Sequence, residues 1–140
     1  FAASIKLPTS GTVFLSVMDK DKEELEPIAE ILSNLGFELM ATKGTAKYLT
    51  EMGFKVTPIK KVIEGSPHIV DALKHGLVDL VINTPEGSQP LLDSTSIRIV
   101  ASQMKIPLFT TMSAGLAAAQ AIRAMHKNEI LNVQALQGYY

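Results

Sequence analysis

The chain has 140 residues, 46% of them hydrophobic, which is enough for one domain with a substantial buried core. Its 13 basic and 14 acidic residues give a net charge of -1, so overall charge favours neither nucleic acid nor an acidic membrane as a partner. The absence of cysteine excludes disulfides and thiolate metal sites and fits a reducing compartment. No apolar run approaches the length of a membrane span. We expect a cytoplasmic domain with no metal, membrane or nucleic-acid partner.

Residues 1–10 differ in character from the rest of the chain. They contain no initiator Met and lead through Pro8 to Gly11, which is typical of a linker. The sequence therefore predicts a linker from a preceding domain over 1–10 and the domain itself over 11–140.

The first half of the domain predicts three strands and two helices. The strands are expected at 12–17, 37–41 and 54–59, and the helices at 23–35 and 46–52. Pro27 falls early enough in its helix to be tolerated, and Gly36 ends that helix. Pro58 cannot donate to a neighbouring strand, so it predicts an edge position for the third strand.

The second half continues the alternation of strands and helices. Loops are expected at 60–67 and 85–90, a short helix at 68–75, strands at 78–84 and 106–111, and an alanine-rich helix at 113–126. Another helix is capped by Asp93 or Ser94, and its inner face is expected to comprise Ile97, Val100, Ala101 and Met104. Residues 130–136 alternate enough to predict a terminal strand or extended tail. This order predicts a three-layer α/β/α fold with a parallel sheet covered on both faces.

The junction at 40–46, Met-Ala-Thr-Lys-Gly-Thr-Ala, stands where a strand hands over to a helix. Backbone N–H groups and the positive end of the helix dipole make such a place receptive to an anion, most often a phosphate. Gly44 lets a ligand approach the backbone, and the hydroxyls of Thr42 and Thr45 can donate to its oxygens. The alternative reading is that Thr45 merely caps its helix.

Other polar residues follow the predicted strands at the same edge of the sheet, where open α/β sheets leave a crevice. They include Asp19, Lys20, Asp21 and Lys22 after the first strand, Lys60 and Lys61 after the third, Asn83 and Thr84 after the fourth, and Thr110, Thr111 and Ser113 after the fifth. Cations, hydroxyls and an amide on one rim predict a phosphorylated polar ligand such as a nucleotide.

Several segments, in order, carry a family resemblance. They are Asp21-Lys22, the block 36–46, Lys61-Val62, the block 64–69, Ile82-Asn83-Thr84, Asp93 with Ile97-Arg98, and Thr110-Thr111. The chain resembles the C-terminal regulatory domains of carbamoyl phosphate synthetase large subunits, which belong to the methylglyoxal synthase-like superfamily. The resemblance implies a flavodoxin-like, five-stranded parallel sheet, and it makes 1–10 the end of a preceding synthetase domain.

The resemblance also implies a function. The domain would regulate the synthesis of carbamoyl phosphate from bicarbonate, glutamine and ATP, for pyrimidine and arginine biosynthesis, and would hold no catalytic group or cofactor of its own. Its parent, a ligase, would use ATP with Mg or Mn. Its partners would be the remaining synthetase domains, the glutaminase small subunit and a nucleotide monophosphate effector, UMP or IMP.

Carried over by position, the residues expected to hold the nucleotide are Lys22, Thr42, Thr45, Lys61, Asn83 and Thr84, to which the junction argument adds Gly44. Thr110 and Thr111 mark a candidate second effector region, where relatives respond to ornithine. Three positions depart from the family pattern: Pro85 replaces a second threonine, Ile99 follows Arg98 in place of a second arginine, and Leu108 stands where relatives carry Tyr.

Two other classes of function remain open at this point. A free-standing methylglyoxal synthase needs a carboxylate as general base, in a Gly-Gly-Asp-Gln-type run. Here the corresponding Gly65-Ser66-Pro67-His68 has no acid; Asp71 is expected to face solvent, and His68 to cap a helix or contact the ligand. A phosphate-binding or oligomerisation domain that transmits no signal is the other alternative.

Overall fold

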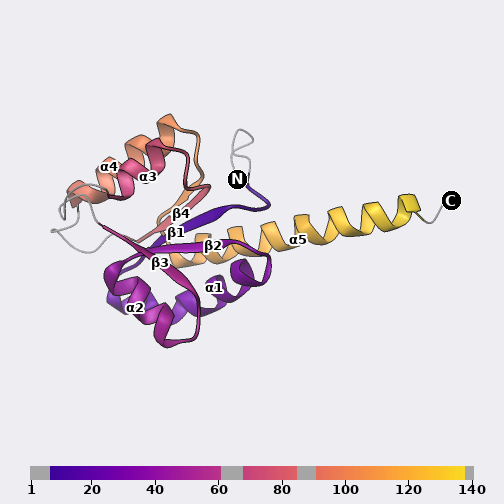
Figure 1. Cartoon of the computed structure of the whole chain (residues 1–140), viewed down its shortest axis with the longest axis horizontal. Helices are drawn as coiled ribbons and strands as arrows, with labels where there is room; N and C mark the ends of the chain where they lie inside the picture. Colours follow the sequence, from indigo (N-terminus) through magenta and orange to yellow (C-terminus); the bar gives the residue numbers. More distant parts are fainter. Residues whose placement is uncertain (1–6, 61–67, 85–90, 138–140) are drawn as a thin grey trace.

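The computed structural model describes residues 7–60, 68–84 and 91–137, which form a three-layer α/β/α domain (Figure 1). Its five strands pair in parallel, in the order β3-β2-β1-β4-β5. The strands are β1 (Thr12–Ser16), β2 (Glu38–Thr42), β3 (Val56–Ile59), β4 (Leu80–Asn83) and β5 (Leu108–Phe109). The predicted fold class is confirmed, while the domain boundary at residue 10 stays a prediction.

The helices cover the sheet on both faces (Figure 1). They are the 3-10 segment η1 (Asp19–Glu24), α1 (Leu25–Asn34), α2 (Lys43–Glu51), α3 (Ile69–Lys74), α4 (Leu91–Gln103) and α5 (Met112–Gln137). One hydrophobic cluster joins α1, α2 and α5 to the sheet, and a second joins α3 and α4 to its other face. The chain thus builds a core on each side of a central sheet.

The central strand β1 shows why its sequence is continuously apolar. Val13 and Leu15 belong to the cluster under α1 and α5, whereas Phe14 belongs to the cluster under α3 and α4, and all three are fully buried. Side chains of a strand alternate between faces, so a strand covered on both faces has no solvent-facing position for a polar residue. By contrast, among the described strands β3 pairs with β2 alone, and Pro58 lies on this edge strand, as predicted.

The path of the chain creates a switch point between β1 and β4. From β1 the chain builds outward through β2 to β3, then returns to place β4 on the other side of β1. Connections therefore leave β1 and β4 in opposite directions, and open α/β sheets generally leave a crevice beyond the carboxyl ends of the strands at such a point. This crevice is where the fold favours ligand binding.

Three predicted helix starts were wrong. The acidic segment 19–24 is a 3-10 turn preceding α1, which itself starts at Leu25. The second helix, α2, starts at Lys43 rather than 46, and α4 starts at Leu91, so Asp93 and Ser94 lie inside α4 and do not cap it. The inner face of α4 includes Ile97, Val100 and Ala101, but Met104 is 43% exposed because α4 ends at Gln103, just before it.

The predicted terminal strand at 130–136 was also wrong, because α5 continues to Gln137. No Gly or Pro occurs between 116 and 137, and Ala, Leu and Gln, all good helix formers, are frequent there. Local alternation of apolar residues could not outweigh this propensity without a strand to pair with. In Figure 1 the second half of α5 extends away from the sheet. None of the helices in the described ranges has the length and apolar character that crossing a membrane requires.

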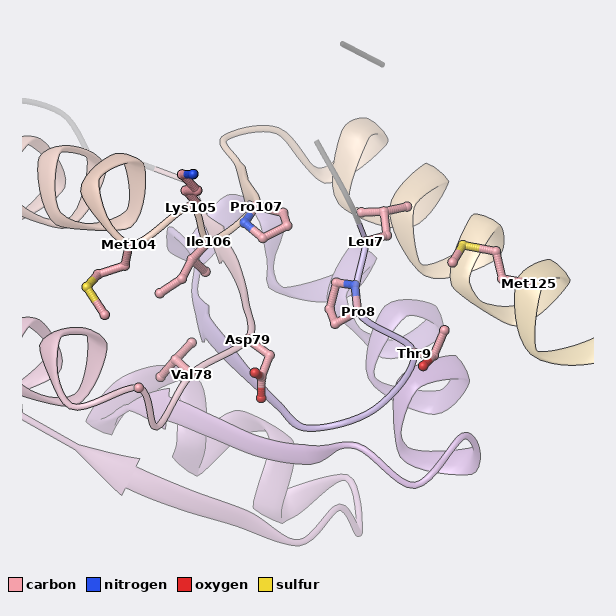
Figure 2. A pocket seen from close by; sticks show the side chains of 11 residues that line it. Leu7, Pro8, Thr9, Val78, Asp79, Met104, Lys105, Ile106, Pro107 and Met125 are labelled. Atoms are coloured by element: carbon pink, nitrogen blue, oxygen red, sulfur yellow. The ribbon is translucent and has the colours of Figure 1, made fainter. Parts of the chain in front are cut away.

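The opposite, amino-terminal edge of the sheet holds a shallow cavity of about 560 Å³ (Figure 2). Its walls come from the segments that precede β1, β4 and β5 and from α5, including Leu7, Val78, Ile106 and Met125. None of the residues predicted to bind a ligand lines it. The cavity is therefore separate from the ligand site that the sequence predicts.

Candidate functional site at the carboxyl edge of the sheet

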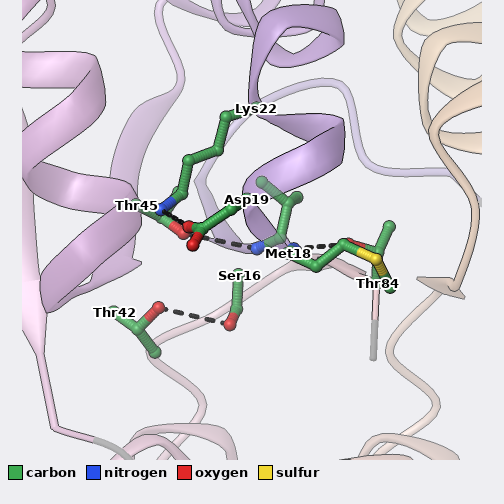
Figure 3. Close-up of polar contacts among 8 residues, drawn as sticks. Ser16, Met18, Asp19, Lys22, Thr42, Thr45 and Thr84 are labelled. Carbon is green, nitrogen blue, oxygen red and sulfur yellow. Dashed lines mark hydrogen bonds and ion pairs between the residues drawn. The ribbon is translucent and has the colours of Figure 1, made fainter. Parts of the chain in front are cut away.

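Two hydroxyl side chains meet where β1 and β2 end. The Thr42 hydroxyl donates a hydrogen bond to Ser16 Oγ over 3.2 Å (Figure 3). Thr42 is buried and Ser16 is half-buried. Thr42 was predicted from the sequence, whereas Ser16 was not; the available signal was a hydroxyl residue near the carboxyl end of the strand predicted at 12–17. The pair lies at the carboxyl edge of the sheet, beside the switch point between β1 and β4.

Thr45 and Thr84 hold the chain where it leaves β1. The hydroxyl oxygen of Thr45 accepts a hydrogen bond from the Val17 N–H at 3.3 Å, and that of Thr84 accepts one from the Met18 N–H at 3.0 Å (Figure 3). Both threonines are almost fully buried, 2% and 5% exposed respectively. Because a hydroxyl that accepts a hydrogen bond can still donate its own proton, each can also contact a ligand oxygen.

The start of α2 lies at this edge, as the junction at 40–46 predicted. Thr42 occupies the N-cap position with an extended backbone, but its side chain makes no capping bond and is turned to Ser16. Gly44 and Thr45 belong to the first helical turn and not to a loop before it, so Thr45 does not cap the helix. The first N–H groups of a helix lack partners within it, and they leave a positive end that attracts anions.

Lys22 brings a cation to the same place from the end of η1. Its side chain is 18% exposed, and Nζ lies 2.5 Å from Asp19 Oδ1. Nζ also lies 3.5 Å from where a Cβ on Gly44 would stand, so the ammonium group sits beside the first turn of α2 (Figure 3). Because Gly44 has no side chain, the Lys22 ammonium group can lie close to the backbone of α2.

Asn83 completes the group from the end of β4. Its side chain is 6% exposed, and its Cα is paired in register with that of Ser16. The structure therefore gathers most of the predicted site residues at one edge, namely Lys22, Thr42, Gly44, Thr45, Asn83 and Thr84. Lys61 and Pro85 lie outside the described residues.

The candidate second effector region, Thr110 and Thr111, follows β5. Both residues are exposed. The Thr111 hydroxyl oxygen accepts a hydrogen bond from the Ala114 N–H at 3.1 Å, so this side chain caps the start of α5. This capping bond gives the Thr111 hydroxyl a structural role that needs no ligand. Ornithine binding at Thr110 and Thr111 stays a prediction.

His68 and Asp71 lie together at the start of α3. The Asp71 carboxylate accepts a hydrogen bond from the His68 N–H at 3.0 Å, and its Oδ2 lies 3.6 Å from His68 Nδ1. Asp71 is a helix residue whose side chain is 35% exposed, so it partly faces solvent as expected, and its carboxylate in addition stabilises the helix start. His68 is the N-cap residue of α3, which agrees with the first of its two predicted roles, capping a helix or contacting the ligand. Within the described part of the chain, no group of three or more His, Cys, Asp or Glu side chains is arranged to hold a metal.

Comparison with known proteins identifies the family. The profile of the MGS-like domain matches residues 24–110, which include β2, α2 and β4. The chain belongs to the MGS-like domain family.

Relatives of this MGS-like domain are parts of a much longer chain. It is 47% identical over 138 residues to the carbamoyl phosphate synthase large chain of Rhizobium meliloti, covering 99% of this domain and 12% of that protein. It is 45% identical over 130 residues to a Methanopyrus kandleri protein named carbamoyl phosphate synthase large chain, C-terminal section, covering 92% of this domain and 24% of that protein. The domain thus spans about 12% of a full large chain.

A solved structure supports the fold. The crystal structure of methylglyoxal synthase from Elizabethkingia anophelis superposes with a TM-score of 0.62 at 20% sequence identity, covering 84% of this domain and 79% of that chain. At this identity the likeness shows a shared fold and carries no conclusion about activity.

Proposed function

We propose that this MGS-like domain is the allosteric effector-binding domain of a carbamoyl phosphate synthase large chain. It binds a nucleoside monophosphate such as UMP and thereby regulates carbamoyl phosphate synthesis for the pyrimidine and arginine pathways. The observation that carries the proposal is the ammonium group of Lys22, on a side chain only 18% exposed, beside the first turn of α2 and next to the hydroxyl of Thr45. The names of the two relatives, one a large chain and one the C-terminal section of a large chain, support the parent.

The phosphate of the effector is bound at the start of α2. Lys22 offsets its negative charge, and the hydroxyls of Thr42 and Thr45 with the free N–H groups near Gly44 donate to its oxygens. Asn83 contacts the sugar or base through its amide, which both donates and accepts, and Thr84 lies beside it. Lys61 supplies a second cation.

The parent of this domain is a cytoplasmic ligase that uses ATP with Mg or Mn and works with a glutaminase small subunit. Regulation requires contact between this domain and the remaining synthetase domains of the large chain. IMP is a second candidate effector, because a site that grips mainly the phosphate tolerates different bases.

Titration calorimetry of the 140-residue chain with UMP, IMP and uridine tests the proposal. At least one monophosphate should bind and uridine should not, because hydrogen bonds to charged groups contribute about 1.5–3 kcal/mol each. Lys22→Met should weaken monophosphate binding about tenfold or more, the loss of one such bond. Lys20→Met, at an exposed position in the same 3-10 segment, should leave binding unchanged. Equal affinity for uridine and UMP would overturn the phosphate assignment.

A further inference from the structure

Lys22 and Asp19 form an ion pair whose two members differ sharply in exposure. Asp19 Oδ1 lies 2.5 Å from Lys22 Nζ, yet the Asp19 side chain is 88% exposed and that of Lys22 only 18%. The carboxylate is therefore far more open to solvent than the lysine side chain with which it pairs. Figure 3 shows this carboxylate directly beside Lys22 Nζ, where a ligand anion that pairs with Lys22 would also have to lie.

The surroundings of Lys22 favour a negative charge at this position. The ammonium group lies 3.5 Å from the Cβ position of Gly44, in the first turn of α2, where the helix end is itself positive. Two positive sources side by side repel each other unless an anion lies close to both. In the ligand-free domain the carboxylate of Asp19 is such an anion.

We propose that Asp19 is an internal competitor for the effector's phosphate. It occupies Lys22 in the free domain, and the phosphate must displace it to reach the ammonium group. This inference rests on the proposed function, since it assumes that the phosphate binds at Lys22. Asp19 then sets the effector concentration at which regulation begins, without contributing to the bound state.

The displacement is feasible because an ion pair with an exposed member is weak. A phosphate monoester has about two negative charges and several acceptor oxygens, so it binds the ammonium group more strongly than one carboxylate does. When only a fraction of molecules is competent to bind, the apparent affinity falls by that fraction. A pair of this strength lowers it by about two- to fivefold.

Asp19→Asn should therefore tighten binding of UMP and of inorganic phosphate about two- to fivefold, measured by calorimetry on the 140-residue chain. The matched control is Asp21→Asn, which removes the same charge from the same 3-10 segment. It should change the affinity by clearly less, because Asp21 does not form the ion pair with Lys22.

Each outcome decides between distinct alternatives. Unchanged or weaker phosphate binding by Asp19→Asn overturns the competitor role, and weaker binding would make Asp19 a positioning residue for Lys22. Equal tightening by Asp19→Asn and Asp21→Asn also overturns it, because net charge alone would then explain the gain. If the unsubstituted chain binds neither UMP nor phosphate, the proposed function itself fails.

Discussion

At the scale of single residues, the threonines of the site have a structural role besides any ligand contact. Thr45 and Thr84 accept hydrogen bonds from consecutive backbone N–H groups, of Val17 and Met18. These bonds connect residues 17–18, which follow β1, to α2 on one side and to the end of β4 on the other. Since η1 begins directly after these residues, the position of Lys22 depends on both bonds.

Thr84→Val should lower the free energy of unfolding by about 1–3 kcal/mol, because the Met18 N–H then has no acceptor in a partly buried place. Thr84→Ser keeps the hydroxyl and should recover most of the loss. Urea denaturation measures both. Thr57→Val, at an exposed position on β3, is the control and should stay within about 0.5 kcal/mol. A loss of stability in Thr57→Val as large as in Thr84→Val would contradict this account.

At the scale of elements, two glycines that lie inside helices of the described part of the chain have opposite surroundings. Gly44 is exposed in the first turn of α2, and its Cβ position meets only Lys22 Nζ, at an ordinary contact distance of 3.5 Å. Gly115 in α5 is buried, and its Cβ position lies 3.1 and 3.2 Å from two atoms of Ile82. Close packing of α5 on the sheet therefore depends on Gly115.

The same substitution should have opposite effects at these two positions. Gly44→Ala should raise the free energy of unfolding by about 0.5 kcal/mol, since alanine restricts the unfolded chain and fits the helix. It should also weaken UMP binding, because its methyl group occupies the approach to Lys22. Gly115→Ala should lower the free energy of unfolding by about 1 kcal/mol or more through overpacking against Ile82. Urea denaturation of both variants checks the signs, and a stabilised Gly115→Ala would refute the packing argument.

At the scale of the whole molecule, the regulation proposed for this domain is a coupling free energy between its effector site and a distant active site. Such couplings are typically about 1–3 kcal/mol, and weakening effector binding does not change the coupling itself. A substitution in the effector site should therefore shift the concentration dependence of regulation, and the fully bound enzyme should behave as before.

Thr45→Ala in the full-length synthetase should move the nucleotide response to about tenfold higher concentration or more, with the same plateau at saturation. The physical reason is that Thr45→Ala removes one of the hydrogen bonds proposed to bind the phosphate of the nucleotide. Steady-state synthesis rates over a range of UMP or IMP concentrations measure the shift. Because Thr45 also accepts the Val17 N–H, Thr45→Ser should restore the response by restoring the hydroxyl. Thr50→Ala, on the exposed side of the same helix, should not shift the response. A changed plateau with an unshifted midpoint would contradict the effector-site assignment.

The sequence by itself determined the layered parallel fold and the edge of the sheet that carries the site. Short runs rich in β-branched and aromatic residues, such as 12–17, favour strands buried on both faces, and polar residues following parallel strands gather at one edge because all those strands end there. Pro58 likewise restricted its strand to an edge through a missing donor. These features follow from local chemistry, so they could be predicted without coordinates.

Only the tertiary structure decided where each side chain of the site is directed. Local patterns could not show that the Thr42 hydroxyl donates to Ser16, that Thr45 accepts from Val17, or that Lys22 pairs with Asp19 beside Gly44. They also placed the start of α2 too late and mistook the end of α5 for a strand. These contacts and boundaries depend on the strand order β3-β2-β1-β4-β5, which brings together residues far apart in the chain. Sequence periodicity identifies which face of an element is buried, but the partner on that face is fixed only when the sheet assembles.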